Sequence, residues 1–140
     1  MGVFDVFKNK LRKKTTNVDF EKVQYTGKMK LENNFDGPID SPTWQQVQLY
    51  IDKMLQNNEE FITLTLCEAV NGVRYMQACS VKGGYTLELG IETDDKTNLV
   101  GKACDQKELV ERFAQFYKYG IVDDVDQFKP VSFLHDSQFA

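Results

Sequence analysis

The sequence predicts a single α+β domain: an antiparallel meander of about four to five strands with two main helices packed on one face. Three observations predict this fold. Residues 61–67, 73–81 and 85–91 alternate apolar and polar side chains with the two-residue period of a β-strand. The turns between these runs are too short to hold the crossover helices of a parallel sheet. Two other runs, beginning near Trp44 and Asp105, place apolar residues at helical spacing.

The composition is that of one globular domain. Of the 140 residues, 41% are hydrophobic and 12% are aromatic, which suffices to build a core. No stretch approaches the roughly 18 consecutive apolar residues that a membrane-spanning helix needs. At the N-terminus the apolar residues precede the basic ones, which is the reverse of a secretory signal. We therefore expect a soluble, cytoplasmic protein without a transmembrane segment.

Residues 1–14 form a basic, amphipathic segment, and residues 15–140 form the domain. In the segment, Phe4, Phe7 and Leu11 fall on one face of a helix, and five basic residues lie between positions 8 and 14. Two interpretations stay open. The aromatic face docks on a protein surface, or the segment makes weak contact with an anionic membrane surface.

The pattern is weakest in residues 15–40. Brief alternation in residues 18–25 predicts one strand, and the asparagines and glycine of residues 33–38 indicate a turn-rich connection. The first helix follows, with Asp40 or Ser41 as its cap and Pro42 in its first turn. Its apolar face consists of Trp44, Val47, Ile51, Met54 and Leu55.

The three central strands should form one antiparallel sheet. Asn71 and Gly72 fit a two-residue hairpin turn, because both central positions of that turn take positive φ. Residues 93–98 predict a polar turn, and residues 99–103 predict a fourth strand. The alternation in each run predicts which side chains share a face. In the first run these are Ile62, Leu64 and Leu66, and in the second run they are Val73, Tyr75, Gln77, Cys79 and Val81. In the third run the side chains expected inside are Tyr85, Leu87, Leu89 and Ile91, and those expected outside are Thr86, Glu88, Gly90 and Glu92.

The second helix has clear signals at both ends. Asp105 can cap it, with Glu108 three residues later as in a capping box, and Gly120 can end it as a left-handed cap. Glu108 and Arg112 have the spacing of a helical ion pair. The tail after Gly120 adds a strand or packs as an extended arm. The core should bury Trp44, Leu64, Leu87, Leu89, Phe113 and Phe116.

The sequence contains no recognisable catalytic, cofactor or metal site. Cys67, Cys79 and Cys104 follow no zinc or redox spacing, so we interpret them as buried thiols. The single histidine, His135, lies five residues from the end, where a catalytic base would be poorly held. The acidic turns lack the spaced carboxylates and terminal glutamate of a calcium loop. We therefore expect neither enzymatic activity nor a cofactor.

The charge is distributed unevenly along the chain. Residues 1–30 contain eight Lys/Arg and three Asp/Glu, whereas residues 31–140 contain nine and eighteen. An acidic body repels phosphate backbones, which argues against nucleic-acid binding and favours a basic protein partner. The candidate partner-binding residues are Glu88 and Glu92 on the outward strand face, Asp94 and Asp95 in the following turn, and Asp123, Asp124 and Asp126 after the second helix.

Six segments carry a family resemblance: MGVFDVFKNK, DSPTWQQVQLYIDKM, FITLTLC, RYMQACSV, GGYTLELGIE and ELVERFAQFYKYG. Together they resemble the small bacterial immunity proteins that are encoded beside polymorphic toxins. The order of elements also resembles the secretion-chaperone-like peptide-binding fold. Both resemblances imply a binding protein without catalytic residues, and neither assigns a role to the tail that bears His135.

The first expectation is therefore a non-catalytic immunity protein. It would neutralise a cognate toxin by binding to a basic domain of that toxin. Acidic inhibitors are steered to the basic sites of nuclease toxins, which fits this chain. Two alternatives stay open: a chaperone-like protein that binds peptides or secretion substrates, and, less favoured, a small enzyme that uses Cys79 or His135. The immunity protein should bind one partner tightly, and the chaperone-like protein should bind several peptides weakly. The enzyme should lose turnover when a single residue is substituted.

Deleting residues 2–14 should leave the thermal unfolding midpoint nearly unchanged, because the best contacts expected for this segment are local. Calorimetry of the full and the shortened chain measures the effect. A large fall in the midpoint would mean that the face with Phe4 and Phe7 belongs to the core.

Overall fold

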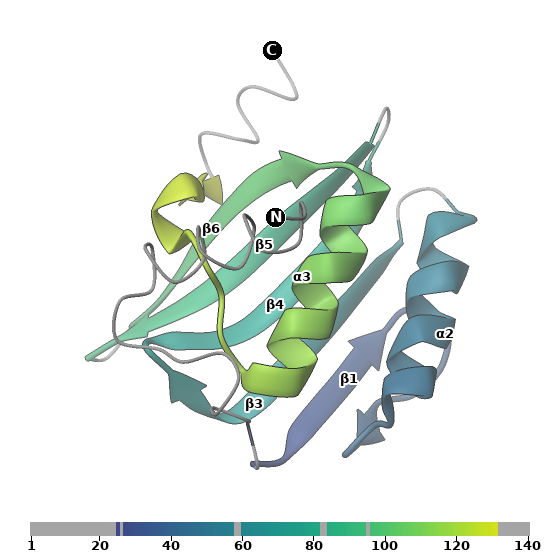
Figure 1. Ribbon diagram of the computed structural model, residues 1–140, viewed down its shortest axis with the longest axis horizontal. Helices are drawn as coiled ribbons and strands as arrows, with labels where there is room; N and C mark the ends of the chain where they lie inside the picture. Colours follow the sequence, from purple (N-terminus) through teal and green to yellow (C-terminus); the bar gives the residue numbers. More distant parts are fainter. Residues whose placement is uncertain (1–24, 26, 58–59, 82–83, 95, 132–140) are drawn as a thin grey trace, which may run out of the picture.

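The computed structural model describes residues 25, 27–57, 60–81, 84–94 and 96–131, drawn in colour in Figure 1. Tyr25 is described but lies in no strand, and the rest of the strand predicted in residues 18–25 lies outside the described residues, as do residues 1–14 and His135. In chain order the elements are β1 (Met29–Asn33), β2 (Ile39–Asp40), α2 (Trp44–Leu55), β3 (Phe61–Val70), β4 (Val73–Val81), β5 (Gly84–Thr93), β6 (Lys96–Cys104), α3 (Gln106–Tyr119), the 3-10 turn η1 (Val125–Gln127) and β7 (Lys129–Pro130).

The strands form one antiparallel sheet in the order β2-β1-β3-β4-β5-β6-β7. The predicted α+β class and antiparallel meander are confirmed, but the sheet has seven strands rather than four or five. Two of the additional strands, β2 and β7, contain only two residues each, which is too short to show an alternating pattern. The third, β1, does alternate, since Met29 and Leu31 are buried and Lys30 is exposed between them.

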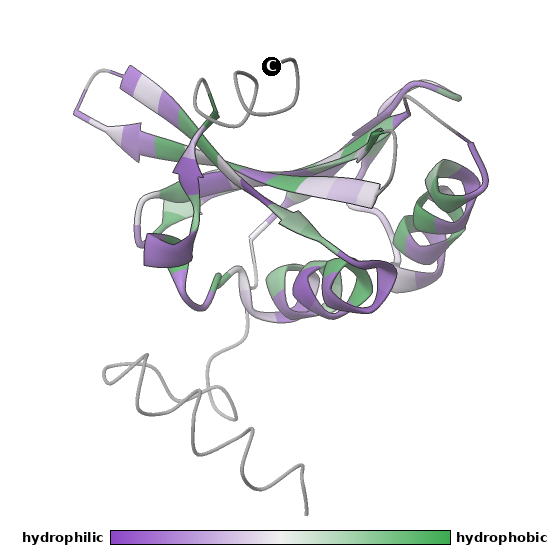
Figure 2. Ribbon diagram, turned by 90° about the horizontal axis from the view of Figure 1, so that it is seen from above, coloured by the Kyte–Doolittle hydropathy of each residue, from purple (hydrophilic) through white to green (hydrophobic). Residues whose placement is uncertain are grey.

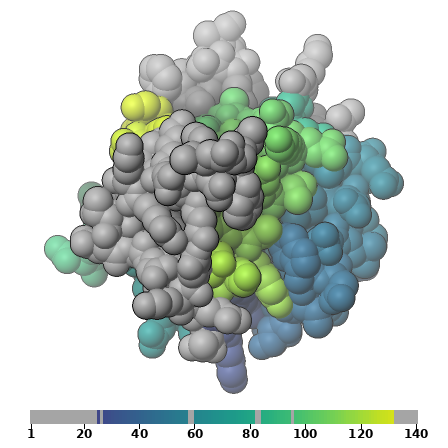
Figure 3. All heavy atoms as spheres, viewed as in Figure 1, coloured from purple at the N-terminus to yellow at the C-terminus, as the bar shows by residue number. Residues whose placement is uncertain are grey.

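The fold has two layers. Figure 2 shows the twisted sheet with α2, α3 and η1 all on one side of it, as the sequence predicted for the two helices. Seen from that side, α2 and α3 lie next to each other over the strands, in blue and green in Figure 3. The other side of the sheet bears none of α2, α3 and η1, and we call it the helix-free face.

The core fills the space between the helices and the sheet. Strand pairing aligns Leu31, Leu64, Met76 and Leu89 in one row across β1, β3, β4 and β5. The helices place their own apolar stripes against this row, as the helical spacing predicted. The largest side chains with almost no solvent exposure are Phe113, Phe116, Leu31, Ile51, Met54, Ile62, Leu64, Leu66, Met76, Leu87, Leu89 and Leu109.

The start of α2 differs from the prediction. Asp40 ends β2, and Ser41 has a left-handed φ of 50° while its N–H donates to the Met29 carbonyl, so neither residue caps the helix. Thr43 is the cap instead, and it forms a reciprocal capping box with Gln46. Trp44 is consequently in the first turn and only half-buried, where its ring lies 5.5 Å from that of Tyr117. The prediction that Trp44 is a fully buried core residue was wrong.

The predicted ends of α3 and the first hairpin turn are confirmed. The Asp105 side chain accepts a hydrogen bond from the Glu108 N–H at 2.8 Å, and Gly120 has a left-handed φ of 67°. Arg112 Nε donates to Glu108 Oε2 at 3.1 Å, which is the expected ion pair one turn apart. Asn71 and Gly72 have φ values of 50° and 84°. These local signals require no tertiary information, which explains why sequence reasoning found them.

Two details of the strands were predicted wrongly. A register irregularity between Val73 and Tyr75 moves Val73 out of the row of Tyr75, and Val73 is buried in the core. The hairpin between β5 and β6 is also tighter than expected: β6 begins at Lys96, so Thr97 and Asn98 pair with β5 instead of forming a turn.

Replacing Phe113 by alanine should lower the free energy of unfolding by about 3–5 kcal/mol, because its fully buried ring leaves a cavity. Leu49, which is 51% exposed on α2, is the matched control. Leu49→Ala should change stability by less than about 0.5 kcal/mol. Urea denaturation measures both values, and equal effects of the two substitutions would contradict the described helix faces.

Candidate functional site

The helix-free face carries a polar row directly beside the apolar row of the core. Strand pairing aligns Glu32, Thr63, Gln77, Glu88 and Gly101 across β1, β3, β4, β5 and β6. In β1, β3, β4 and β5, each residue of the polar row is one position away from a member of the core row. Because successive side chains of a strand point to opposite faces, the polar row lies on the side of the sheet away from the helices.

Hydrogen bonds connect the middle of this row. The Thr63 hydroxyl donates to Gln77 Oε1 at 2.7 Å, and Gln77 Nε2 donates to Glu88 Oε1 at 3.1 Å. The Cys79 thiol donates to the same carboxylate oxygen, with 3.5 Å between Sγ and Oε1. We call Thr63, Gln77, Cys79 and Glu88 the face network. It joins three neighbouring strands through side chains.

Glu88 is the central member of the face network, and its position corrects a prediction. We expected an exposed carboxylate on the outward strand face, but Glu88 is only 6% exposed, and the neighbouring Thr86 is also buried. The orientation of the strand was predicted correctly. Glu88 lies on β5 inside the sheet, where the β4 side chains of Gln77 and Cys79 contact its carboxylate.

An aromatic side chain lies beside the network. The ring of Tyr75 covers Gly90, and a Cβ atom added to Gly90 would come within 2.1 Å of that ring. A residue with a side chain at position 90 would therefore displace the tyrosine. Burial and, after it, the negative charge of Glu88 raise the pKa of Tyr75. The face thus combines a half-buried aromatic ring with a buried acidic group.

The cysteines differ in their surroundings. Burial, followed by the charge of Glu88, raises the pKa of Cys79 to about 12, and burial beside Glu108 raises the pKa of Cys104 to about 12. Cys67 is exposed, and the hydroxyl of Tyr25, 3.2 Å from its sulfur, lowers the pKa of its thiol. The expectation of three buried thiols was therefore wrong for Cys67, which is exposed, and Cys79 and Cys104 are half-buried.

The remaining acidic candidates do not form one cluster. Glu92 is held by Arg74 in an ion pair of 2.7 Å, and Asp94 is exposed at the tip of the β5–β6 hairpin. Asp95 lies outside the described residues. The other three acidic candidates, Asp123, Asp124 and Asp126, follow α3.

Asp123 is buried rather than exposed, because its segment packs against α3, where Arg112 donates to the Asp123 carbonyl at 2.6 Å. Asp124 is half-buried with a left-handed φ of 57°, and Asp126 is exposed in η1. The residues that can steer a partner from the surface are therefore Asp94 and Asp126 rather than the complete predicted set.

A cavity of about 290 Å³ lies between the start of α2 and the end of α3. It is lined in part by Tyr25, Ser41, Pro42, Tyr117 and Lys118. The Tyr117 hydroxyl donates to the Pro42 carbonyl at 2.8 Å, which ties the two helix ends together. The described lining residues include no carboxylate, imidazole or thiol, so this cavity offers hydroxyl groups and one amine for binding and no acid–base pair.

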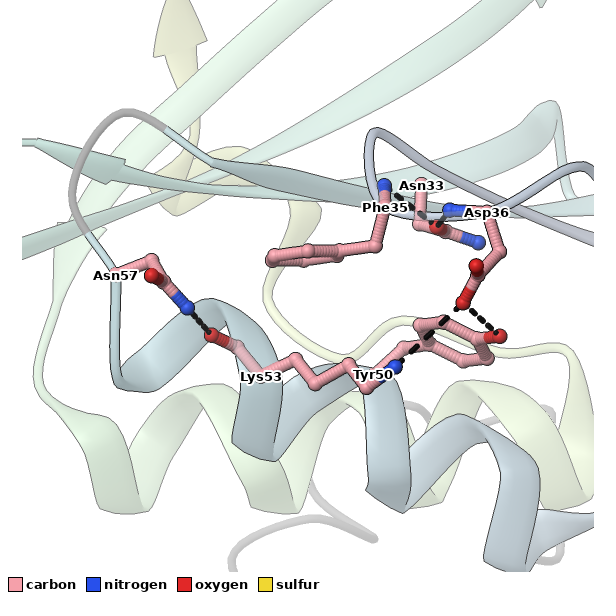
Figure 4. Close-up of polar contacts among 6 residues, drawn as sticks. All are labelled: Asn33, Phe35, Asp36, Tyr50, Lys53 and Asn57. Carbon is pink, nitrogen blue, oxygen red and sulfur yellow. Dashed lines mark hydrogen bonds and ion pairs between the residues drawn. The ribbon is translucent and has the colours of Figure 1, made fainter.

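A second polar cluster fastens the β1–β2 connection to α2 (Figure 4). Asn33 Oδ1 accepts the backbone N–H groups of Phe35 and Asp36, which closes the turn. Tyr50 donates to Asp36 Oδ2 at 2.8 Å, and Lys53 lies 3.5 Å from the same oxygen. The Tyr50 hydrogen bond and the Lys53 charge lower the pKa of Asp36. This arrangement explains how a mostly polar connection is held to the domain.

Within the described residues, no group of His, Cys, Asp and Glu side chains could hold a metal ion, and no helix is long and apolar enough to cross a membrane. Comparison with known proteins adds no assignment. No protein family, curated protein or solved structure matches this chain. The resemblance to immunity proteins therefore stays a prediction, and the site has to be interpreted from its own geometry.

Sequence reasoning found Glu88 but missed the residues that hold it. Gln77 was placed on a strand face, yet its contacts with Glu88 and Thr63 depend on the pairing register. The Asn71-Gly72 turn contains part of this information, since a two-residue loop fixes the register of β3 and β4 nearby. The irregularity between Val73 and Tyr75 cannot be read from that turn and shifts the alignment.

Iodoacetamide at pH 9 should label Cys67 in the folded protein and spare Cys79 and Cys104, because only the thiolate reacts and the folded pKa of the latter two is about 12. This pKa exceeds the ordinary value of 9.0, so both thiols favour the folded state below pH 9 and lose this contribution as the pH rises toward 12. Mass spectrometry locates the label, and denaturant should expose all three cysteines. Equal labelling of the three in the folded protein would contradict the described burial.

Proposed function

We propose that this protein is a non-catalytic protein-binding module, an immunity protein that neutralises a cognate toxin by covering it with the helix-free face. The observation that carries the proposal is the face network, a set of hydrogen-bonded polar side chains on the side of the sheet that bears no described helix. Antiparallel sheets commonly pack one face on the core and leave the other for solvent or a partner.

The composition of the face supports an interface. Phe61, Tyr75 and Leu99 are half-buried there, around the polar residues of the network. Stable interfaces combine such aromatic and apolar contacts with a limited number of fixed polar groups. The network also prearranges its polar groups before binding, which reduces the ordering cost of association.

The surroundings of Cys79 disfavour a catalytic role for its thiol. With a pKa of about 12, the Cys79 thiol stays protonated at neutral pH, and the protonated form is a poor nucleophile. The closest acidic group, Glu88, raises this pKa further instead of activating the thiol. This argument disfavours the alternative of an enzyme that uses Cys79.

The test is binding to the product of the neighbouring gene, measured by calorimetry, together with rescue of growth when the two genes are expressed together. Thr65→Arg introduces a long side chain on the helix-free face, and Gln48→Arg introduces the same side chain on the exposed surface of α2. Thr65→Arg should weaken binding at least about tenfold, and Gln48→Arg should leave the affinity unchanged.

Charge-reversal substitutions distinguish long-range electrostatic steering of the partner from direct contact at the interface. Asp94→Lys and Asp126→Lys should slow association with a basic partner, and added salt should slow the wild type in the same way.

Equal affinity of the Thr65 and Gln48 variants would contradict the assignment of the face. Weak binding to many unrelated peptides, without one tight partner, would favour the chaperone-like alternative.

A further inference from the structure

Among the described residues, the Glu88 carboxylate has hydrogen-bond donors but no positively charged partner. Gln77 and Cys79 both donate to the same oxygen, Oε1, at 3.1 and 3.5 Å. Both donors are neutral groups, and the side chain is 6% exposed. Burying a carboxylate without a positive charge is costly, so such groups are usually paired.

No described lysine or arginine forms an ion pair with Glu88. Arg74 contacts other groups, since it donates to the Leu66 carbonyl at 2.6 Å and to Glu92 at 2.7 Å. Across the other neighbouring strand, Glu88 pairs with Gly101, which has no side chain to offer. The β6 side of the carboxylate therefore lacks the side-chain contact that Gln77 supplies on the β4 side.

The charge of Glu88 affects two neighbouring groups. The negative charge of Glu88 contributes, after burial, to the raised pKa of Cys79 and to the raised pKa of Tyr75. A cation bound at Glu88 would oppose both effects. The centre of the helix-free face is thus a point of negative potential in an otherwise polar and aromatic surface.

We propose that Glu88 is the receptor for a guanidinium group, an arginine side chain that the protein partner inserts at the centre of the helix-free face. The inference rests on the proposed binding function and adds the chemistry of the contact. The Glu88 carboxylate and the ring of Tyr75 near Gly90 suit a guanidinium better than an ammonium, because the planar group donates to carboxylates and also stacks on aromatic rings.

The first experiment needs no partner. Nα-acetyl-arginine amide is titrated into the full-length protein while NMR follows the Gln77 side-chain amide and the Cys79 and Tyr75 signals. The citrulline analogue, which has the same shape without the charge, is the control ligand. Arginine should shift these signals saturably and citrulline should not. Glu88→Gln, which keeps the size of the side chain and an oxygen for Gln77, should abolish the response. The same change at the exposed Glu111 of α3, Glu111→Gln, should preserve it.

The outcomes are distinct. Equal shifts with arginine and citrulline, a stronger response to a lysine analogue, or an unchanged response in Glu88→Gln would each overturn the inference. Shifts that depend on protein concentration alone would assign the site to a second copy of the chain and would also contradict it. The wild-type titration decides the matter even if Glu88→Gln does not fold.

The second experiment measures the affinity of the neighbouring gene's product for wild type, Glu88→Gln and Asp94→Asn. Glu88→Gln should weaken binding about 30-fold or more, as expected for a central contact, and Asp94→Asn should have a small effect that salt removes. Absence of binding by the wild type would contradict the proposed function itself. Tight wild-type binding that Glu88→Gln leaves intact would contradict only the role of Glu88.

Discussion

The pairing register of β3, β4 and β5 is the constraint on which the rest of the structure depends. It aligns Leu64, Met76 and Leu89 in one row and, one residue away, Thr63, Gln77 and Glu88 in the next. The first row forms the sheet side of the core, and the second forms the face network. A shift of one residue in a strand would bring its polar residues beneath the helices and its apolar residues to the helix-free face. Core and candidate site are therefore fixed by the same set of backbone hydrogen bonds.

This coupling explains why a buried acidic group can exist on the side of the sheet that carries no described helix. The core beneath α2 and α3 holds β5 in register, and β4 then supplies Gln77 and Cys79 to the Glu88 carboxylate. The unfavourable burial of Glu88 is offset by the packing of the opposite face. Polar groups held in this way often serve recognition, because their cost is recovered when a complementary group binds.

The sequence predicted those features that depend on local chemistry. Alternation identified the central strands, helical spacing identified both helices, and caps such as Asp105 and Gly120 were recognised from single residues. The short edge strand β2 was missed because two residues show no period. For the tail that contains β7, the sequence left a strand and an extended arm both open. The burial of Glu88 could not be predicted either, because it depends on which residues of β4 lie opposite, and the irregularity after Val73 sets that alignment. Sequence analysis therefore identified the site as an acidic residue on a strand face. The residues that surround Glu88 could be identified only from the folded structure.

The most direct measurement is a side-chain NMR map of β4 when the partner binds. If the helix-free face is the interface, the signals of Tyr75, Gln77 and Cys79 should change, whereas those of Met76 and Ala78, which alternate with them on the core side, should remain in place. This alternating response would show that the polar row receives the partner. Changes confined to the side chains of α2 and α3, or spread equally over both faces of β4, would contradict the account.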